Sequence, residues 1–297
     1  MTSTAPLIDR VTGSNFAYQH LPLERCLDDM ADLGRDRLEL WGIAPHAPVA
    51  WLTDAEARAI RDAAAHRGLQ VACFTPEQVM YPVNIASPDD RLRASSIAMF
   101  RRAAEIAVEL GAGMLFLTSG RGSEDEPRGA GWARSVDALG EITTHAAGLG
   151  LECVLEPLQR VESNLVVTAA DAARMLTDVG ASRLGVALDT VAAAAAGDAV
   201  DDYFRLLGER VRHVHLIDGT PTGHLAWGDG ELPLTLIVDA LDRASYRGLA
   251  TIELFGDGHY ALDPHPALAR SMDAIAEACR PPRTVAIRRG MNHIRMR

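Results

Sequence analysis

Four side chains that could bind one divalent metal ion stand far apart along the chain. They are Glu156, Asp189, His215 and Glu253, and each lies at or near the end of a short apolar run. Carboxylates brought together inside a protein repel one another, and their pKa values rise unless a cation lies between them. Three carboxylates with one imidazole suit Mn²⁺, Mg²⁺ or Co²⁺ better than a structural zinc ion, which prefers thiolates. We therefore predict one bound divalent ion, with Mn²⁺ as the first choice.

The elements that must position these residues follow from an alternation of apolar runs and amphipathic, alanine-rich segments. The runs span residues 37–41, 69–75, 113–118, 151–157, 183–189, 211–218 and 249–255, with a weaker run at 11–16. The helical segments span 21–33, 53–67, 88–110, 131–149, 168–179, 198–207, 234–244 and 264–278. Eight strand–helix units predict an α/β fold of the (β/α)8 TIM-barrel type. A doubly wound sheet is the alternative, but no G-x-G-x-x-G follows the first strand.

Local signals support these units. Thr53 and Glu56 fit a capping box at the start of a helix. Glycines fall at the positions where a left-handed residue commonly ends a helix: Gly34, Gly68, Gly111, Gly150, Gly180 and Gly248. Barrel enzymes carry their active sites at the C-terminal ends of the strands. Since side chains alternate along a strand, Ala187 and Asp189 should face the barrel interior while Leu184, Val186 and Leu188 face the helices.

Composition and charge exclude several classes of function. The chain has 297 residues, of which 48% are hydrophobic, and carries 29 basic against 40 acidic residues, a net charge of −11. This balance disfavours binding to nucleic acid and to anionic membranes. Every basic residue is arginine, so a lysine Schiff base and a P-loop lysine are impossible.

The sequence also suggests a location and a domain organisation. The four cysteines, Cys26, Cys73, Cys153 and Cys279, are widely spaced, which favours reduced thiols. No signal peptide and no membrane span are visible, so we expect a cytoplasmic protein. Residues 1–280 should form one catalytic barrel domain. Residues 281–297 form a basic tail with five arginines and no acidic residue, either a frayed end or an arm that docks on a neighbouring acidic subunit.

Several motifs together resemble a known family. They are QHLPLERCLDDMADLG (19–34), LELWGIAPHA (38–47), FTPEQVMYPVNIAS (74–87), LEPLQRVESNL (155–165), ALDT (187–190), HVHLIDG (213–219), GHLAWGDGELPL (223–234) and TIELF (251–255). In this order they are similar to the xylose-isomerase-like barrel superfamily of sugar isomerases and epimerases. Within it, the chain most resembles the fructoselysine 3-epimerases and the D-tagatose and D-psicose 3-epimerases.

The resemblance implies roles for the four residues above. It implies that Glu156, Asp189, His215 and Glu253 hold the metal ion, and that Glu156 and Glu253 also act as the acid/base pair that removes and returns the proton at C3 of a ketose or ketose conjugate. Metal binding acidifies that proton, and two carboxylates on different strands can flank the sugar. A small carbohydrate is therefore the expected partner, together with a possible second copy of the chain in a homodimer or higher homo-oligomer.

Other residues are candidates for contacts with the substrate. Glu162 matches a glutamate that touches sugar hydroxyls in the ketose 3-epimerases. The chain lacks the arginine of the tagatose-type enzymes, and His224 is a candidate replacement. His46 and Trp41, and Tyr81 and Asn84, follow the second and third strands and are further candidates to line the mouth of the barrel. Glu39 and Glu152 also face the interior by parity but lie deeper, where buried pairing with Arg37 or His213 is expected rather than catalysis.

Three other functions use the same fold. Inosose dehydratases and C-glycoside deglycosidase subunits begin with removal of an acidic C–H proton, so a metal-dependent lyase is the alternative to an epimerase. DNA repair of the endonuclease IV type needs further histidines near the strand ends, and FTPE (74–77) and LTSG (117–120) contain none. A non-catalytic scaffold would not require the intact pair Glu156 and Glu253.

Overall fold

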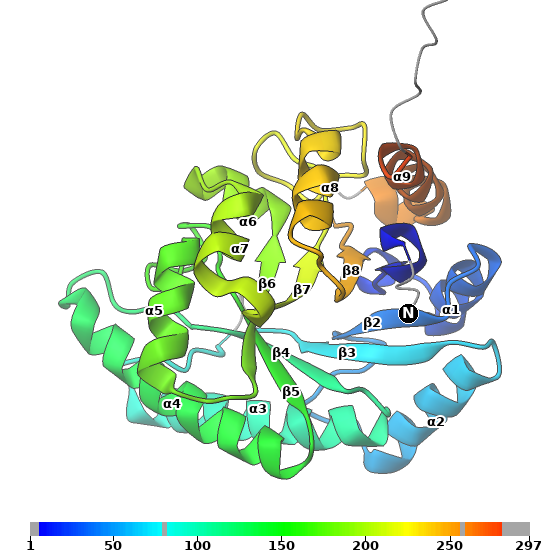
Figure 1. Cartoon of the computed structure of the whole chain (residues 1–297). Helices are drawn as coiled ribbons and strands as arrows, with labels where there is room; N and C mark the ends of the chain where they lie inside the picture. The colour runs from blue at the N-terminus through cyan, green and yellow to red at the C-terminus, as the bar shows by residue number, and fades with distance from the viewer. Residues whose placement is uncertain (1–5, 79–81, 256–258, 281–297) are drawn as a thin grey trace, which may run out of the picture.

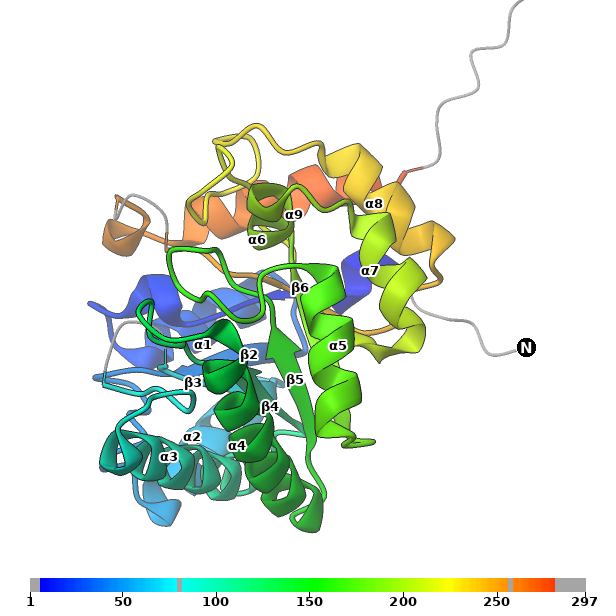
Figure 2. The same cartoon turned by 90° about the vertical axis from the view of Figure 1, so that its left-hand side faces the viewer.

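Eight parallel strands form a single sheet that curves into a barrel with helices around it (Figure 1). The computed structural model describes residues 6–78, 82–255 and 259–280. The strands are β1 (Val11–Gly13), β2 (Arg37–Gly42), β3 (Gln70–Pro76), β4 (Met114–Thr118), β5 (Glu152–Glu156), β6 (Leu184–Asp189), β7 (Val211–His215) and β8 (Leu249–Ile252). The α-helices are α1 (Leu23–Asp32), α2 (Asp54–Ala65), α3 (Asp90–Glu109), α4 (Arg128–Gly148), α5 (Ala169–Val179), α6 (Thr190–Ala196), α7 (Val200–Leu207), α8 (Leu234–Arg243) and α9 (His265–Ala278). Figure 2 shows α4, α5 and α7 on the outer side of the strands. The predicted (β/α)8 barrel is confirmed.

Side chains, rather than a full strand ladder, close the barrel at the seam between β1 and β2. Each strand from β2 to β8 pairs with the next, and β8 pairs with β1. At the seam, Ser14 and Glu39 form a single bridge. Beside it, the amide of Asn15 accepts the N–H of Trp41 at 2.6 Å and donates to the carbonyl of Trp41 at 3.2 Å, as a strand residue would. Asn15 therefore satisfies backbone groups that an open edge would leave exposed.

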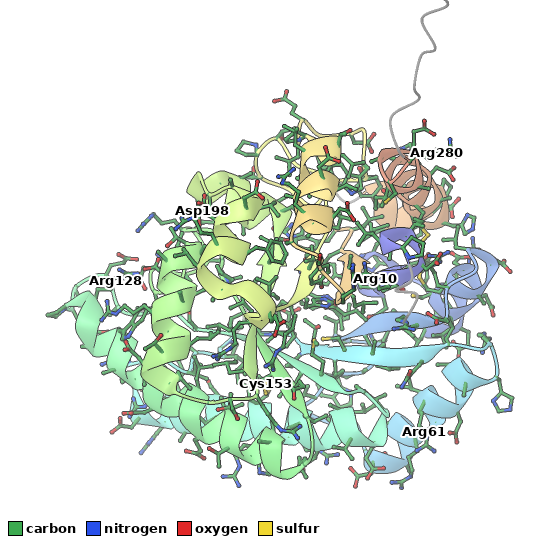
Figure 3. All side chains as sticks on the ribbon, viewed as in Figure 1. Arg10, Arg61, Arg128, Cys153, Asp198 and Arg280 are labelled. Carbon is green, nitrogen blue, oxygen red and sulfur yellow. The ribbon has the colours of Figure 1, made fainter. Side chains whose placement is uncertain are left out.

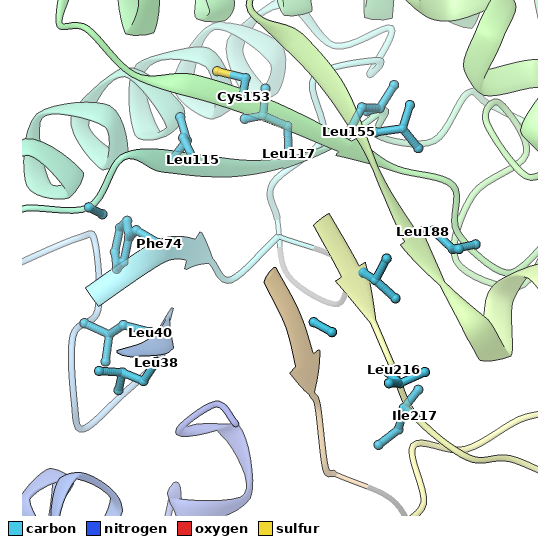
Figure 4. Close-up of a cluster of buried hydrophobic side chains, with 14 of the residues drawn as sticks. Leu38, Leu40, Phe74, Leu115, Leu117, Cys153, Leu155, Leu188, Leu216 and Ile217 are labelled. Atoms are coloured by element: carbon cyan, nitrogen blue, oxygen red, sulfur yellow. The ribbon is translucent and has the colours of Figure 1, made fainter. Parts of the chain in front are cut away.

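The strands separate two apolar layers, as their period of two requires. The outer layer packs against the helices and includes Leu38, Leu40, Phe74, Leu115, Leu117, Leu155 and Leu188, which Figure 4 shows around the strands. The inner layer is small and consists of Cys73, Phe116, Val154 and Ala187. Ala187 thus faces inward while Leu184, Val186 and Leu188 face the helices, and the predicted parity of β6 is confirmed.

Local sequence signals set most helix ends. Thr53 and Glu56 form the predicted capping box at the start of α2. Five of the six predicted glycines have positive φ. The prediction for Gly248 is wrong, because α8 ends earlier and Ser245, with φ of 54°, makes the turn. Gly248 is needed for close approach instead, since a Cβ there would lie 2.4 Å from the carbonyl oxygen of Arg212.

The surface is polar, and the thiols lie largely beneath it. Arginines project outward from several helices, among them Arg61 and Arg128 (Figure 3). All four cysteines are free, and three of them are buried. Within the described ranges, no helix combines the length and apolarity needed to cross a bilayer. The predicted tail at 281–297 lies outside the described residues.

Candidate active site

The four predicted metal ligands meet at the C-terminal end of the barrel. Glu156, Asp189 and His215 are the last residues of β5, β6 and β7, and Glu253 directly follows β8. Nδ1 of His215 lies 3.1 Å from Oε1 of Glu156, 3.2 Å from Oε2 of Glu253 and 3.9 Å from Oδ2 of Asp189. All four side chains are buried. Residues separated by up to 97 positions therefore surround one point because neighbouring parallel strands end together.

A helix that the sequence did not predict fixes Asp189. The chain enters α6 immediately after β6, and Oδ1 of Asp189 accepts the N–H of Ala192 at 2.6 Å as the N-cap. This bond fixes the carboxylate, because an N-cap acceptor must face the first turn. Oδ2 then points toward the other ligands.

The chemistry of the cluster fits a divalent cation. Oδ2 of Asp189 and Oε1 of Glu253 are buried and have no hydrogen-bond partner among the described residues. Buried carboxylate oxygens without partners are costly unless a cation compensates them. Donor atoms of Glu156, Asp189 and His215 lie within 4.8 Å of one another, and so do those of Asp189, His224 and Glu253. Oxygen-rich sets with one or two imidazoles suit Mn²⁺, Mg²⁺ or Co²⁺.

In the metal-free protein, the histidines and carboxylates shift one another's pKa values. Burial raises the pKa of Glu156 to about 8, although His215 opposes this. Burial would likewise raise the pKa of Asp189 and Glu253, but the nearby imidazoles lower both. Burial would lower the pKa of His224, but Asp189 and Glu253 raise it to about 10. Imidazolium charge thus compensates the carboxylates where a metal ion would otherwise do so.

A cavity opens from the cluster toward solvent. Its walls include Glu156, Asp189 and Glu253 at the base, and further residues shared among the loops above the strands: Phe16, Trp41, Glu77, Leu158, Gln159, Glu162, Ala192, His224 and Phe255. One side is aromatic, since the rings of Phe16 and Trp41 lie 4.8 Å apart and those of Phe16 and Phe255 lie 4.6 Å apart. Most of the remaining lining residues are polar. An apolar wall with a few polar groups is typical of a small-molecule site.

Three of the predicted substrate contacts line this cavity. Trp41 belongs to the aromatic wall. Glu162 is half-buried, and its carboxylate accepts the N–H of Gln159 at 3.1 Å. The ring of His224 stacks on Phe255 at 3.8 Å, and its Nε2 lies 3.1 Å from Oε2 of Glu253. His224 therefore reaches the ligand cluster itself, closer than the sequence alone suggested.

Two of the residues predicted to contact the substrate bond to other parts of the protein, and a third lies outside the described residues. Nδ1 of His46 bonds to the Asn15 amide at 2.9 Å and Nε2 bonds to the carbonyl of Leu21 at 2.8 Å, so both ring nitrogens stabilise loops. The Asn84 amide bonds the backbone of Ala86 and of Arg121. Neither residue lines the cavity. Tyr81 lies outside the described residues.

A buried aspartate that the sequence did not single out shapes the loop carrying His224. Asp218 is 2% exposed, and its carboxylate accepts four backbone N–H groups at 2.9 to 3.0 Å. The donors are Gly219, Gly228, Gly230 and Leu232. Asp218 also forms a two-bond antiparallel bridge with Leu225, next to His224. The sequence signals this arrangement only through the glycine-rich run GDG at 228–230, within the motif GHLAWGDGELPL.

Of the two glutamates expected to pair deeper in the barrel, Glu39 has a predicted partner and Glu152 does not. Glu39 bonds His213 through Oε2 at 2.7 Å, which confirms one of the two predicted pairings. Arg37, the other predicted partner, turns outward and pairs with Asp36. Glu152 pairs with Arg212 at the opposite end of the barrel from the cavity.

Comparison with known proteins places this fold and site in a family. Residues 27–278 match the family described as "Xylose isomerase-like TIM barrel". The chain belongs to this family. The fructoselysine 3-epimerase of Shigella flexneri is 33% identical over 240 residues, covering 80% of this chain and 87% of that protein. The D-psicose 3-epimerase of Agrobacterium fabrum (strain C58) is 27% identical over 235 residues, covering 77% and 78%.

Solved structures share the fold over nearly the whole barrel. A D-psicose 3-epimerase crystallised in the presence of D-fructose superposes with a TM-score of 0.75 at 23% identity, covering 91% of this chain and 98% of that one. An L-ribulose 3-epimerase gives a TM-score of 0.76 at 24% identity, covering 94% and 99%. The family resemblance read from the sequence motifs is confirmed by the family match over residues 27–278 and by the 33% identical relative.

Proposed function

We propose that the protein is a divalent-metal-dependent 3-epimerase of a ketose or ketose conjugate. The observation that carries this proposal is the convergence of Glu156, Asp189, His215 and Glu253 around one buried point at the base of a cavity. The relatives named above as 3-epimerases support the choice of reaction. Mn²⁺ is the ion we propose, and a cytoplasmic location and a homo-oligomeric assembly are proposals from the sequence.

The four ligand side chains would hold the ion, and two of them have a second task. A bound divalent ion would polarise the substrate carbonyl and so acidify the neighbouring C3–H. Glu156 and Glu253 come from strands that are not neighbours, and His215 Nδ1 lies between their carboxylates. We propose that one carboxylate accepts the C3 proton from one face of the sugar. The other then returns a proton to the opposite face, which inverts C3.

The rest of the cavity would orient the sugar. His224, Gln159 and Glu162 offer polar atoms for its hydroxyl groups, while Phe16, Trp41 and Phe255 offer an apolar surface for its C–H face. Among the described residues that line the cavity, none is an arginine, and the chain contains no lysine. Phosphate recognition usually relies on such cations. We therefore propose a free sugar or a conjugate rather than a sugar phosphate.

Exchange of the C3 proton with solvent tests this proposal. The protein with Mn²⁺ is incubated in D₂O with D-fructose, D-psicose, D-tagatose and a fructosyl-amine conjugate, and NMR follows deuterium incorporation at C3. E156Q and E253Q should each slow the interconversion of the two C3 epimers, followed in the same spectra, at least ~10²-fold, because each lacks one proton carrier. E109Q, on the outer surface of α3, serves as the matched control. No exchange with any ketose would contradict the proposal, and loss of water from a substrate would favour a lyase.

A further inference from the structure

A buried carboxylate lies directly beneath the proposed metal site. Glu39 is 0% exposed and comes from β2, across the barrel from β7. It is not adjacent to the cavity, so it cannot touch a substrate there. Burying an ionised carboxylate is costly unless several donors surround it. Several donors surround Glu39 and offset this cost.

Two histidines and one threonine converge on this carboxylate. Thr75 donates its hydroxyl to Oε1 at 2.6 Å, and Nε2 of His213 bonds Oε2 at 2.7 Å. Nε2 of His215 lies 3.2 Å from each of the two carboxylate oxygens. Both oxygens thus accept from more than one donor. A carboxylate with this many donors is held in one orientation.

The two nitrogens of the His215 ring therefore face different groups. Its Nε2 side faces Glu39, and its Nδ1 side faces Glu156, Asp189 and Glu253. The ring also stacks on Phe116, with centroids 4.9 Å apart and planes 5° from parallel, so it cannot turn without breaking this packing. A metal-binding histidine commonly donates its other N–H to a carboxylate, which fixes the tautomer and increases the basicity of the ligand nitrogen.

We infer that Glu39 is a positioning residue that keeps the proton of His215 on Nε2 and so presents the Nδ1 lone pair to the metal ion. This inference rests on the proposed function, because it assumes that His215 is a ligand. Glu39 acts through His215 and has no contact with the substrate. His213 shares the same carboxylate, but its Nδ1 has no hydrogen-bond partner among the described residues.

Metal affinity, rather than activity, provides the test. Mn²⁺ binding is measured by chelator competition for the wild-type protein and for E39Q, E39D and T75V. E39Q should bind ~10–100-fold more weakly, because its amide is a poorer acceptor than a carboxylate. E39D keeps the charge and should lie between E39Q and wild type. T75V removes a different donor to the same carboxylate and should change the dissociation constant less than ~3-fold.

Thermal unfolding separates positioning from general destabilisation. E39Q should lose most of the rise in Tm that Mn²⁺ produces, whereas a purely structural role would lower Tm equally with and without metal. Wild-type affinity in folded E39Q would overturn this inference alone, as would equal losses in E39Q and T75V. If E39Q does not fold, E39D decides, and wild-type affinity in E39D overturns the inference. Absence of Mn²⁺ binding to the wild-type protein would overturn the proposed function as well.

Discussion

Replacing Asp218 by asparagine should destabilise the loop that carries His224. Each carboxylate oxygen of Asp218 accepts two backbone N–H groups, Oδ1 from Gly219 and Leu232 and Oδ2 from Gly228 and Gly230. Asparagine keeps only one acceptor oxygen, so either orientation of the amide loses two bonds and places an NH₂ group against two N–H donors. Hydrogen bonds to a charged group contribute about 1.5–3 kcal/mol each, so D218N should lose roughly 3–6 kcal/mol.

Urea unfolding of the metal-free protein measures this loss. The matched control is D229N, in the same loop, because Asp229 bonds Tyr260 and Arg270 at the surface and its amide could still accept a bond. We expect D229N to lose about 1 kcal/mol. A loss below ~1 kcal/mol in D218N, or the same loss in both variants, would refute the argument that Asp218 holds the loop. Digestion of D218N by a protease between residues 219 and 232 would show where the structure opens.

Three further predictions concern the ion, the substrate and the same loop. Mn²⁺ at about 100 times its dissociation constant should stabilise the protein by about 2.7 kcal/mol and raise Tm by roughly 5–10 °C, reversibly with EDTA; an unchanged Tm would count against a metal site. H224Q should raise KM about 10-fold through a lost substrate contact while Mn²⁺ affinity, followed by chelator competition, changes less than ~3-fold; an equal loss of metal affinity would instead make His224 a ligand. G230A should destabilise the protein by at least ~1–3 kcal/mol in urea unfolding, because its Cβ would lie 2.4 Å from Oδ1 of Asp218, and a neutral substitution would show that the loop adapts.

The barrel could be predicted from the sequence because the patterns that indicate its strands and helices are local and repeated. Alternating apolar runs and glycines at helix ends depend on a few neighbouring residues, and eight repetitions compensate for errors in any one. Predictions were wrong or missing where a residue's place in the fold is determined by tertiary contacts and not by its neighbours in the sequence. Gly248 looks like a helix end, but it is small because the backbone of Arg212 lies close by. Helix α6 is only 7 residues long. Its alanines favour a helix, but it follows the apolar run of β6 directly and has no alternation of polar and apolar positions to mark it as a separate element.

The cluster of candidate metal ligands was predictable for a different reason, which is that parallel strands place their last residues at one rim of the barrel. The contacts made by loop residues could not be predicted in this way. His46 and Trp41 both follow β2 on that rim, yet His46 turns its ring into the protein against Asn15 and Leu21. Glu39 was expected to be buried and paired, but its second bond, to His215, depends on a residue 176 positions away. Such a pairing has no local sequence signal.

Diffraction from crystals soaked with Mn²⁺ tests the central claim most directly. At a wavelength where manganese scatters anomalously, we predict one strong peak in the barrel, in contact with carboxylate oxygens of Glu156, Asp189 and Glu253 and with Nδ1 of His215. A peak bound by other residues, or no peak within reach of His215 Nδ1, would contradict the account.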